Sequence, residues 1–426
     1  MKYTPIRKCH PADRKSLQDF IIPKFFNRGK GAQNHMTVVD IRNIVTDSNV
    51  ELISISPSTI YYAEEKDEEG HRSLFILEYN RETRRERIIA NYFLIKPSFV
   101  QHYFDFPEEI LIVMENGGST VWLLSLDKET GREKALEEIH FVGGFFGCKA
   151  LDENHVIFYT QENEKHRGMF EEYRRTTGFA RVACLYDISE HRYYYIRDRR
   201  ICSLLPENLI TYDVGGQTQL LILQPYGSEE EKEHCYRNRR WLGEGVEDSV
   251  WLCTLLDFVV GVKSAESHLP LERVLSAGTD GLVRFAGMDD YNLYFRAKHF
   301  PTSDQRICAV SKATVRKEVV ADLNLKENEA PASFYIDTDA AQVFRVEELE
   351  DGYHITGTLN SAVDTYYSKE LGDFVCCIQD RFIVARYMMS DENDTFTFYS
   401  VFDSKTGKQQ SYECQCTVKG NTVVLY

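Results

Sequence analysis

The chain has 426 residues, of which 43% are hydrophobic and 27% are charged. This composition is typical of a globular protein with a sizeable core and excludes a disordered or low-complexity chain. Lysine and arginine number 50 against 66 aspartate and glutamate residues, so the formal charge is −16. A field of that sign repels phosphate backbones and anionic lipid, and we expect binding to neither nucleic acid nor membrane.

The first 36 residues differ from the rest of the chain. They are locally basic, and residues 11–21 have the pattern of one short helix that Pro23 would end. We expect residues 1–36 to form an N-terminal arm, which either packs over the main domain or docks to a partner. The sequence has no apolar signal region and no window near the ~18 apolar residues that a spanning helix needs. We therefore expect a cytoplasmic protein.

After the arm, short apolar strands recur in pairs that are joined by polar loops. The pairs are 59–64 with 73–79, 110–115 with 120–126, 155–159 with 181–186, 209–213 with 219–223, 293–296 with 306–310, and 382–387 with 395–401. Two longer gaps each leave room for one more unit, at 251–285 and at 334–358. A period of ~40–50 residues built from short strands indicates a β-propeller with four antiparallel strands per blade.

We therefore predict an all-β fold, with residues 37–426 forming a single seven-bladed β-propeller. Eight blades are the alternative. Closure of a propeller commonly pairs strands from the two ends of a chain. Residues 36–41 or 52–55 would then share a sheet with residues 416–425.

One segment carries a resemblance to known repeats. Residues 120–131, TVWLLSLDKETG, are an apolar strand followed by a turn that Asp127 opens and Gly131 completes, and residues 403–408 nearly repeat this turn. The segment resembles the third strand and following turn of WD-repeat and quinoprotein-like blades. Trp-Asp and Gly-His dipeptides are absent from the chain. The resemblance extends over residues 45–426, implies a β-propeller and points to no specific family.

The cysteines favour a reducing compartment. There are 11 of them, an odd number without a Cys-x-x-Cys pair. Cys184, Cys253 and Cys308 lie within apolar strand patterns, so we expect them to be buried and reduced. Residues 250–260 form the most apolar stretch of the chain, and despite the interruptions at Thr254 and Asp257 we predict a buried strand there.

Two segments are longer than a hairpin requires. Residues 161–179 carry apolar anchors and are either a functional lid or a plain insertion. Residues 227–241 begin with an acidic run that we expect to be solvated. His234 and Cys235 in this segment have no second pair at zinc-ligand spacing, so we predict no metal site.

Standard catalytic signatures are missing, including the Gly-x-Ser-x-Gly elbow, the P-loop and His-Glu-x-x-His. No catalytic residue and no cofactor is therefore assigned. His166 and His299 lie on two polar loops and could converge with Arg167, Arg296 and Arg386 over one face of the propeller. Histidine together with arginine suits an anionic ligand.

We accordingly expect a cytoplasmic binding or scaffold propeller whose partner is a protein or an anionic small molecule. The alternative is a propeller enzyme, such as a lyase, hydrolase or lactonase, that acts on a sugar or a sugar acid. An enzyme should hold a His, an acid and an Arg around one deep axial pocket. A scaffold should instead present a flat face with exposed aromatic side chains.

Overall fold

Antiparallel four-stranded sheets repeat along the chain of the computed structural model. It describes residues 36–426 except 43–48, 69–70, 95–98, 116–119, 141–142, 163, 165–166, 178–180, 203, 226, 239–246, 327–328, 330, 339 and 391–394. The predicted arm over residues 1–36 lies outside this range but for Met36, so its helix stays a prediction. Within the described residues, no helix is long and apolar enough to cross a membrane.

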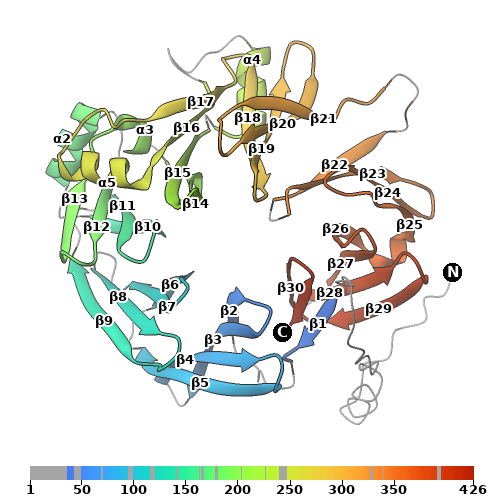
Figure 1. The fold of residues 1–426 in the computed structure, drawn as a ribbon, viewed down its shortest axis with the longest axis horizontal. Coiled ribbons are helices and arrows are strands. Elements are labelled where there is room, and N and C mark those ends of the chain that lie inside the picture. The colour runs from blue at the N-terminus through green and yellow to red at the C-terminus, as the bar shows by residue number, and fades with distance from the viewer. Residues whose placement is uncertain are drawn as a thin grey trace. The chain divides into compact units, whose positions relative to one another are not determined.

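The sheets follow one another in chain order, and we name them blades 1 to 8 (Figure 1). Blade 1 contains β2 (Asn49–Ile55), β3 (Thr59–Glu68), β4 (His71–Asn80) and β5 (Arg85–Leu94). Blade 2 contains β6 (Phe99–Asp105), β7 (Glu109–Glu115), β8 (Thr120–Asp127) and β9 (Glu133–His140). Blade 3 contains β10 (Gly144–Ala150), β11 (His155–Gln161), β12 (Arg181–Asp187) and β13 (Arg192–Tyr195). Blade 4 contains β14 (Leu209–Val214), β15 (Gln217–Gln224), β16 (Ser249–Thr254) and β17 (Glu272–Ser276).

The remaining blades continue the pattern. Blade 5 contains β18 (Gly281–Met288), β19 (Asn292–His299), β20 (Asp304–Ser311) and β21 (Lys317–Asp322). Blade 6 contains β22 (Ala332–Asp337), β23 (Gln342–Glu348), β24 (Gly352–Leu359) and β25 (Asp364–Ser368). Blade 7 contains β26 (Asp373–Ile378), β27 (Phe382–Ser390), β28 (Thr395–Asp403) and β29 (Lys408–Glu413). Blade 8 has three described strands, β1 (Thr37–Asp40), β31 (Thr422–Leu425) and β30 (Cys416–Lys419).

Blade 8 joins the two ends of the domain. Strand β1 pairs in parallel with β31, and the amide of Thr37 donates to the carbonyl of Asn421 at 2.8 Å. At the other end of the ladder, the amide of Ile41 donates to Leu425 at 3.0 Å. The predicted closure through residues 36–41 is confirmed, whereas Leu52 and Ile53 belong to blade 1.

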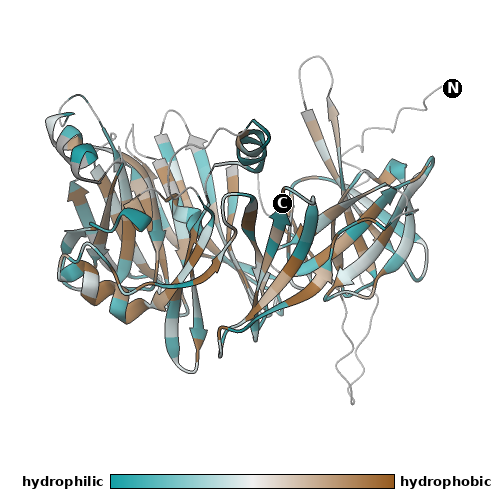
Figure 2. Ribbon diagram, turned by 90° about the horizontal axis from the view of Figure 1, so that it is seen from above, coloured by the Kyte–Doolittle hydropathy of each residue, from teal (hydrophilic) through white to brown (hydrophobic). Residues whose placement is uncertain are grey.

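The core is divided among the interfaces between neighbouring blades. Eight buried hydrophobic clusters occur among the described residues, and each joins two consecutive sheets. The series closes on itself, because Val424 packs with blade 1 while Val423 and Leu425 pack with blade 7. Figure 2 shows hydrophobic residues running along the strands. The chain is therefore an all-β propeller with eight blades, the alternative count of the sequence analysis.

The difference in blade count comes from the ends and from the first long gap. All six predicted strand pairs are antiparallel neighbours, and the second gap holds blade 6. The first gap holds no additional blade. It contains the outer strands of blade 4 and the start of blade 5, together with one inserted helix, α5 (Leu255–Lys263).

The helices lie in the connections between strands. Among the described residues they are α2 (Arg167–Thr177), α3 (Arg199–Cys202), α4 (Glu229–Arg237) and α5 (Leu255–Lys263), with short 3₁₀ segments at Pro206–Asn208 and Lys369–Leu371.

Helix α5 corrects the strand predicted over residues 250–260. The strand β16 ends at Thr254, whose hydroxyl caps the helix by accepting from the amide of Asp257 at 3.0 Å. The buried residues Leu255, Phe258 and Val259 then follow helical spacing. The two polar residues that seemed to interrupt a strand are therefore the helix start.

Candidate functional site

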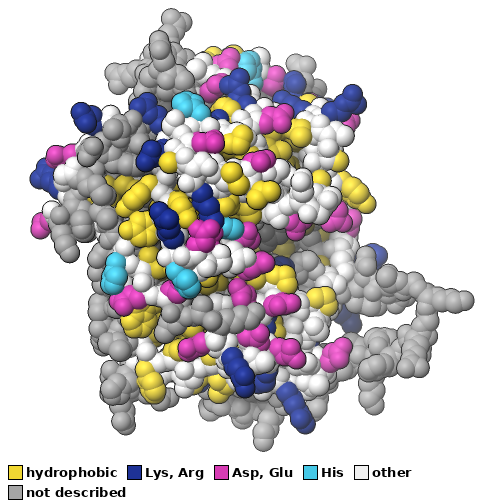
Figure 3. All heavy atoms as spheres, turned by 60° about the vertical axis from the view of Figure 1, so that its left-hand side comes forward, with side chains coloured by type: hydrophobic (Ala, Val, Ile, Leu, Met, Phe, Trp, Pro, Cys, Tyr) yellow, Lys and Arg dark blue, Asp and Glu magenta, His cyan; other side chains and the backbone are white. Residues whose placement is uncertain are grey.

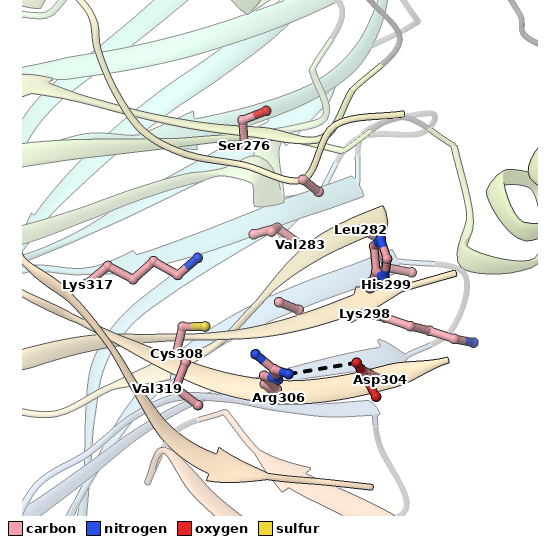
Figure 4. Close-up of a pocket in the computed structure, with 12 residues that line it drawn as sticks. Ser276, Leu282, Val283, Lys298, His299, Asp304, Arg306, Cys308, Lys317 and Val319 are labelled. Carbon is pink, nitrogen blue, oxygen red and sulfur yellow. Dashed lines mark ion pairs between the residues drawn. The ribbon is translucent and has the colours of Figure 1, made fainter. Parts of the chain in front are cut away.

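A groove of about 270 Å³ lies between blades 4 and 5. Its floor crosses all four strands of blade 5, with Val283 on β18, Ala297 on β19, Cys308 on β20 and Val319 on β21 (Figure 4). The strand register places these side chains on one face of the sheet. Ser276, at the end of β17, forms part of the opposite wall.

The groove forms at the part of the interface between blades 4 and 5 where the side chains are small. Leu293, Phe295 and Val310 on the same face of blade 5 are buried in the cluster shared with blade 4. Along the groove, the interface instead offers Ala277 and Ala297. Close packing is lost where both blades contribute short side chains, and this leaves the space open.

Charged residues surround the apolar floor. The guanidinium of Arg306 lies 3.7 Å from the carboxylate of Asp304, and Nε2 of His299 lies 3.4 Å from Asp280. In the part of the chain that the structure describes, Lys317 has no acidic partner. Figure 4 shows Arg306 turned toward Asp304 and Lys317 extending toward the floor. The groove thus combines an apolar floor with cationic groups at its edges.

Helix α4, inserted between β15 and β16, contacts blade 5 through Arg296 and Lys298. It forms because Ser228 and Glu231 make a capping box, in which the Ser228 hydroxyl accepts from the Glu231 amide at 3.1 Å and the Glu231 carboxylate accepts from the Ser228 amide at 2.9 Å. Acidic residues in the first turn also stabilise the helix, because their negative charge interacts favourably with the positive end of the helix dipole.

Blade 5 binds the acidic residues of α4. Nζ of Lys298 lies 3.2 Å from Glu229 and 3.0 Å from Glu233, and Arg296 also donates to Glu229. Burial alone would lower the pKa of Lys298, but its bonds to these two carboxylates raise that pKa above the ordinary value. The acidic run expected to be solvated is therefore docked in part on blade 5.

A buried ion pair anchors the same helix. Nζ of Lys232 lies 3.0 Å from the carboxylate of Asp248, and the two side chains are 3% and 1% exposed. Arg284 of blade 5 donates to Asp248 and to the carbonyl of Gly227, the latter at 3.0 Å. Because an unpaired buried charge is costly, this network holds α4 and blade 5 together. The sequence offered no local signal for it.

Two of the predicted ligand-binding residues lie on β19, and one of them lines the groove. His299 is at the end of β19 and lines it, and its Nδ1 lies 3.0 Å from the Thr302 hydroxyl. Arg296 is on the same strand, three residues earlier, so it faces the other side of the sheet. There it binds Glu229, an anion that the chain itself supplies.

The other three predicted residues belong to other parts of the chain. His166 lies outside the described residues. Arg167 begins α2 of blade 3, where it is 73% exposed and lies 3.6 Å from Glu162 and 3.4 Å from Glu171. Arg386 is exposed on β27 of blade 7. Convergence of these residues on one ligand stays a prediction.

The long segment 161–179 contains helix α2, which is fastened to blade 3. Phe170 is fully buried, and a methyl group added to Gly143 would come within 2.5 Å of its ring. Gly143 has a φ of +102°, and a Cβ there would also come within 2.5 Å of the carbonyl oxygen of Gln161, so this position requires glycine. The burial of Phe170 favours an insertion that covers apolar surface over a detachable lid.

A further titratable cluster lies between blade 3 and α5. Nδ1 of His155 lies 2.9 Å from Asp152, and its Nε2 lies 3.4 Å from Asp187. Lys263 of α5 reaches Asp187 at 2.5 Å and Glu190 at 2.7 Å. This network ties the helix to the blade. Among the described residues, no group of three or more His, Cys, Asp or Glu is arranged to hold a metal ion.

Exposed aromatic residues are scattered over several blades. Tyr193 and Tyr195 on β13 have ring centroids 5.6 Å apart and are 38% and 40% exposed. Phe93 on β5 and Tyr366 on β25 are also exposed. Figure 3 shows a face on which charges of both signs are mixed with hydrophobic side chains. These aromatic residues lie on the fourth strands of blades 1, 3 and 6.

The similarity of this chain to known proteins concerns its fold. No family model and no curated protein matches the chain. It is 10% identical to a prolyl endopeptidase over 86% of this chain and 49% of that one, with a TM-score of 0.45. It is 12% identical to an oligogalacturonate lyase from Vibrio parahaemolyticus, over 82% and 88% of the two chains, with a TM-score of 0.39.

A third solved structure is the β-propeller domain of the Trilobed protease from Pyrococcus furiosus. It is 9% identical over 85% of this chain and 97% of that one, with a TM-score of 0.40. The chain spans about half the length of the prolyl endopeptidase. At such identities, the likeness concerns the fold alone.

Proposed function

We propose that this β-propeller is a binding module that takes a small anionic ligand in the groove between blades 4 and 5. The observation that carries the proposal is the placement of Arg306 and Lys317 at the edges of an apolar groove of about 270 Å³. A protein with a formal charge of −16 repels anions in general, so a local pair of cations is needed to attract one. Arginine can also bind a carboxylate in bidentate fashion.

The proposal is tested by calorimetric titration of the protein with acetate, benzoate, phosphate and galacturonate. At least one of these anions should bind, and the double variant Arg306→Gln with Lys317→Gln should lose at least tenfold in affinity for it. Lys405→Gln is the matched control, because Lys405 is an exposed cation on a turn of blade 7. Equal affinity in the double variant and the control would refute the proposal, and so would the absence of binding by every anion.

An enzyme acting on a sugar or sugar acid stays the alternative prediction. His299, Asp304 and Arg306 do line one groove, but this groove reaches Val319 on the outermost strand of blade 5, away from the axial position expected for an enzyme. Turnover of galacturonate or a sugar lactone by the purified protein, lost in His299→Gln, would favour the enzyme over the binding module.

A further inference from the structure

We infer that the groove takes a carboxylate with an apolar body, such as a single ring, and discriminates against sugar acids. This inference rests on the proposed function, since it names the class of anion that the same groove would take.

The first argument is the chemistry of the floor. Val283, Ala297 and Val319 offer no hydrogen-bonding side-chain atoms, and the thiol of Cys308 is a weak donor. The backbone groups below them are engaged in the ladders that join β18 to β21. A sugar acid would bring several hydroxyl groups against this surface, and each would lose its water without gaining a partner. A ligand whose ring carries no hydroxyl groups would lose no hydrogen bonds to water on this surface.

The second argument is size. An apolar cavity of about 150 Å³ is sufficient to hold benzene. The groove, at about 270 Å³, has room for one ring together with a carboxylate. The volume is therefore sufficient for a compact acid with one ring.

The third argument is the position of the cations relative to the floor. Arg306 lies in the same strand as Cys308, two residues earlier, so both side chains are on the groove face of β20. Asp304, at 3.7 Å, lies beside the guanidinium and favours its position at the edge. A ligand whose ring covers Ala297 and Cys308 would thus present its carboxylate to Arg306, which is directly opposite Ala297, whereas Lys317 is opposite Val310, farther along the floor.

The experiment compares benzoate with galacturonate by calorimetric titration of the full-length chain. Benzoate should bind at least tenfold more tightly than galacturonate. Ala297→Leu, which fills the floor, should weaken benzoate binding at least tenfold. Val319→Thr keeps the shape of the side chain and adds a hydroxyl, and it should weaken benzoate severalfold. Circular dichroism and the urea midpoint establish that each variant is folded.

The outcomes separate the two proposals. If galacturonate binds as tightly as benzoate or more tightly, the inference about ligand class is overturned while an anion-binding groove stands. If benzoate binds but neither floor variant weakens it, the floor does not contact the ligand and the inference is again overturned. If no anion binds the wild-type protein, the proposed function falls together with the inference. Should Ala297→Leu fail to fold, the Val319→Thr result decides.

Discussion

Removal of strand β31 should destabilise the whole propeller, although it deletes only five residues when the chain ends at Asn421. Val423, Val424 and Leu425 are each fully buried, between blade 7 on one side and blade 1 on the other. Burial of such a side chain stabilises a fold by about 1.5–3 kcal/mol, so the three together contribute about 5–9 kcal/mol. This is comparable with the entire stability of a typical domain, about 5–15 kcal/mol. Strand β1 would also lose its only described partner strand.

The assay is urea unfolding followed by tryptophan fluorescence. Trp122 lies in blade 2 and Trp251 in blade 4, so both report on parts of the chain remote from the closure. The truncated chain should unfold at a much lower urea concentration or fail to fold, whereas Lys419→Ala, an exposed change in the same hairpin, should leave the midpoint unchanged. An unchanged midpoint in the truncated protein would show that β31 only frays and that closure does not support the ring.

Three further outcomes are expected. Burial raises the pKa of the Cys184 thiol to about 12, so it should stay reduced and react slowly with thiol reagents in the folded protein; rapid labelling or a native disulfide found by mass spectrometry would contradict this. Phe170→Ala should lower the free energy of unfolding by about 3–5 kcal/mol in urea titrations, and an unchanged value would revive the lid interpretation of α2. Burial alone would lower the pKa of His155, but its bonds to Asp152 and the negative charge of Asp187 raise that pKa above the ordinary value of about 6.5. The ionised imidazole therefore stabilises the fold fully at a pH below about 6.5, and this stabilisation is lost as the pH rises through the raised pKa. His155→Gln should therefore cost more stability at pH 5.5 than at pH 8.5, and an equal cost at both would show that His155 does not titrate as argued.

The local chemistry of the chain was enough to predict the repeated strands. Alternation of apolar and polar residues and turns opened by residues such as Asp127 depend on neighbours only a few positions away. For that reason the six strand pairs could be located without a structure, and so could the buried position of Cys184. The same local pattern misassigned residues 255–260, because an apolar run is compatible with a buried strand and with a buried helix, and the cap at Thr254 decides between them.

Contacts between distant residues were decided only by the tertiary structure. The sequence left residues 36–41 and 52–55 as alternative closing segments, and the tertiary structure decides for the first by pairing Thr37 with Thr422. Likewise, Arg296 was predicted to bind an external anion, yet Glu229, 67 residues away in sequence, occupies it. The groove has the same origin, since its lining combines Ser276 of blade 4 with residues from all four strands of blade 5. Short side chains are common in every strand, and whether they leave a cavity depends on which residues the neighbouring blade packs against them.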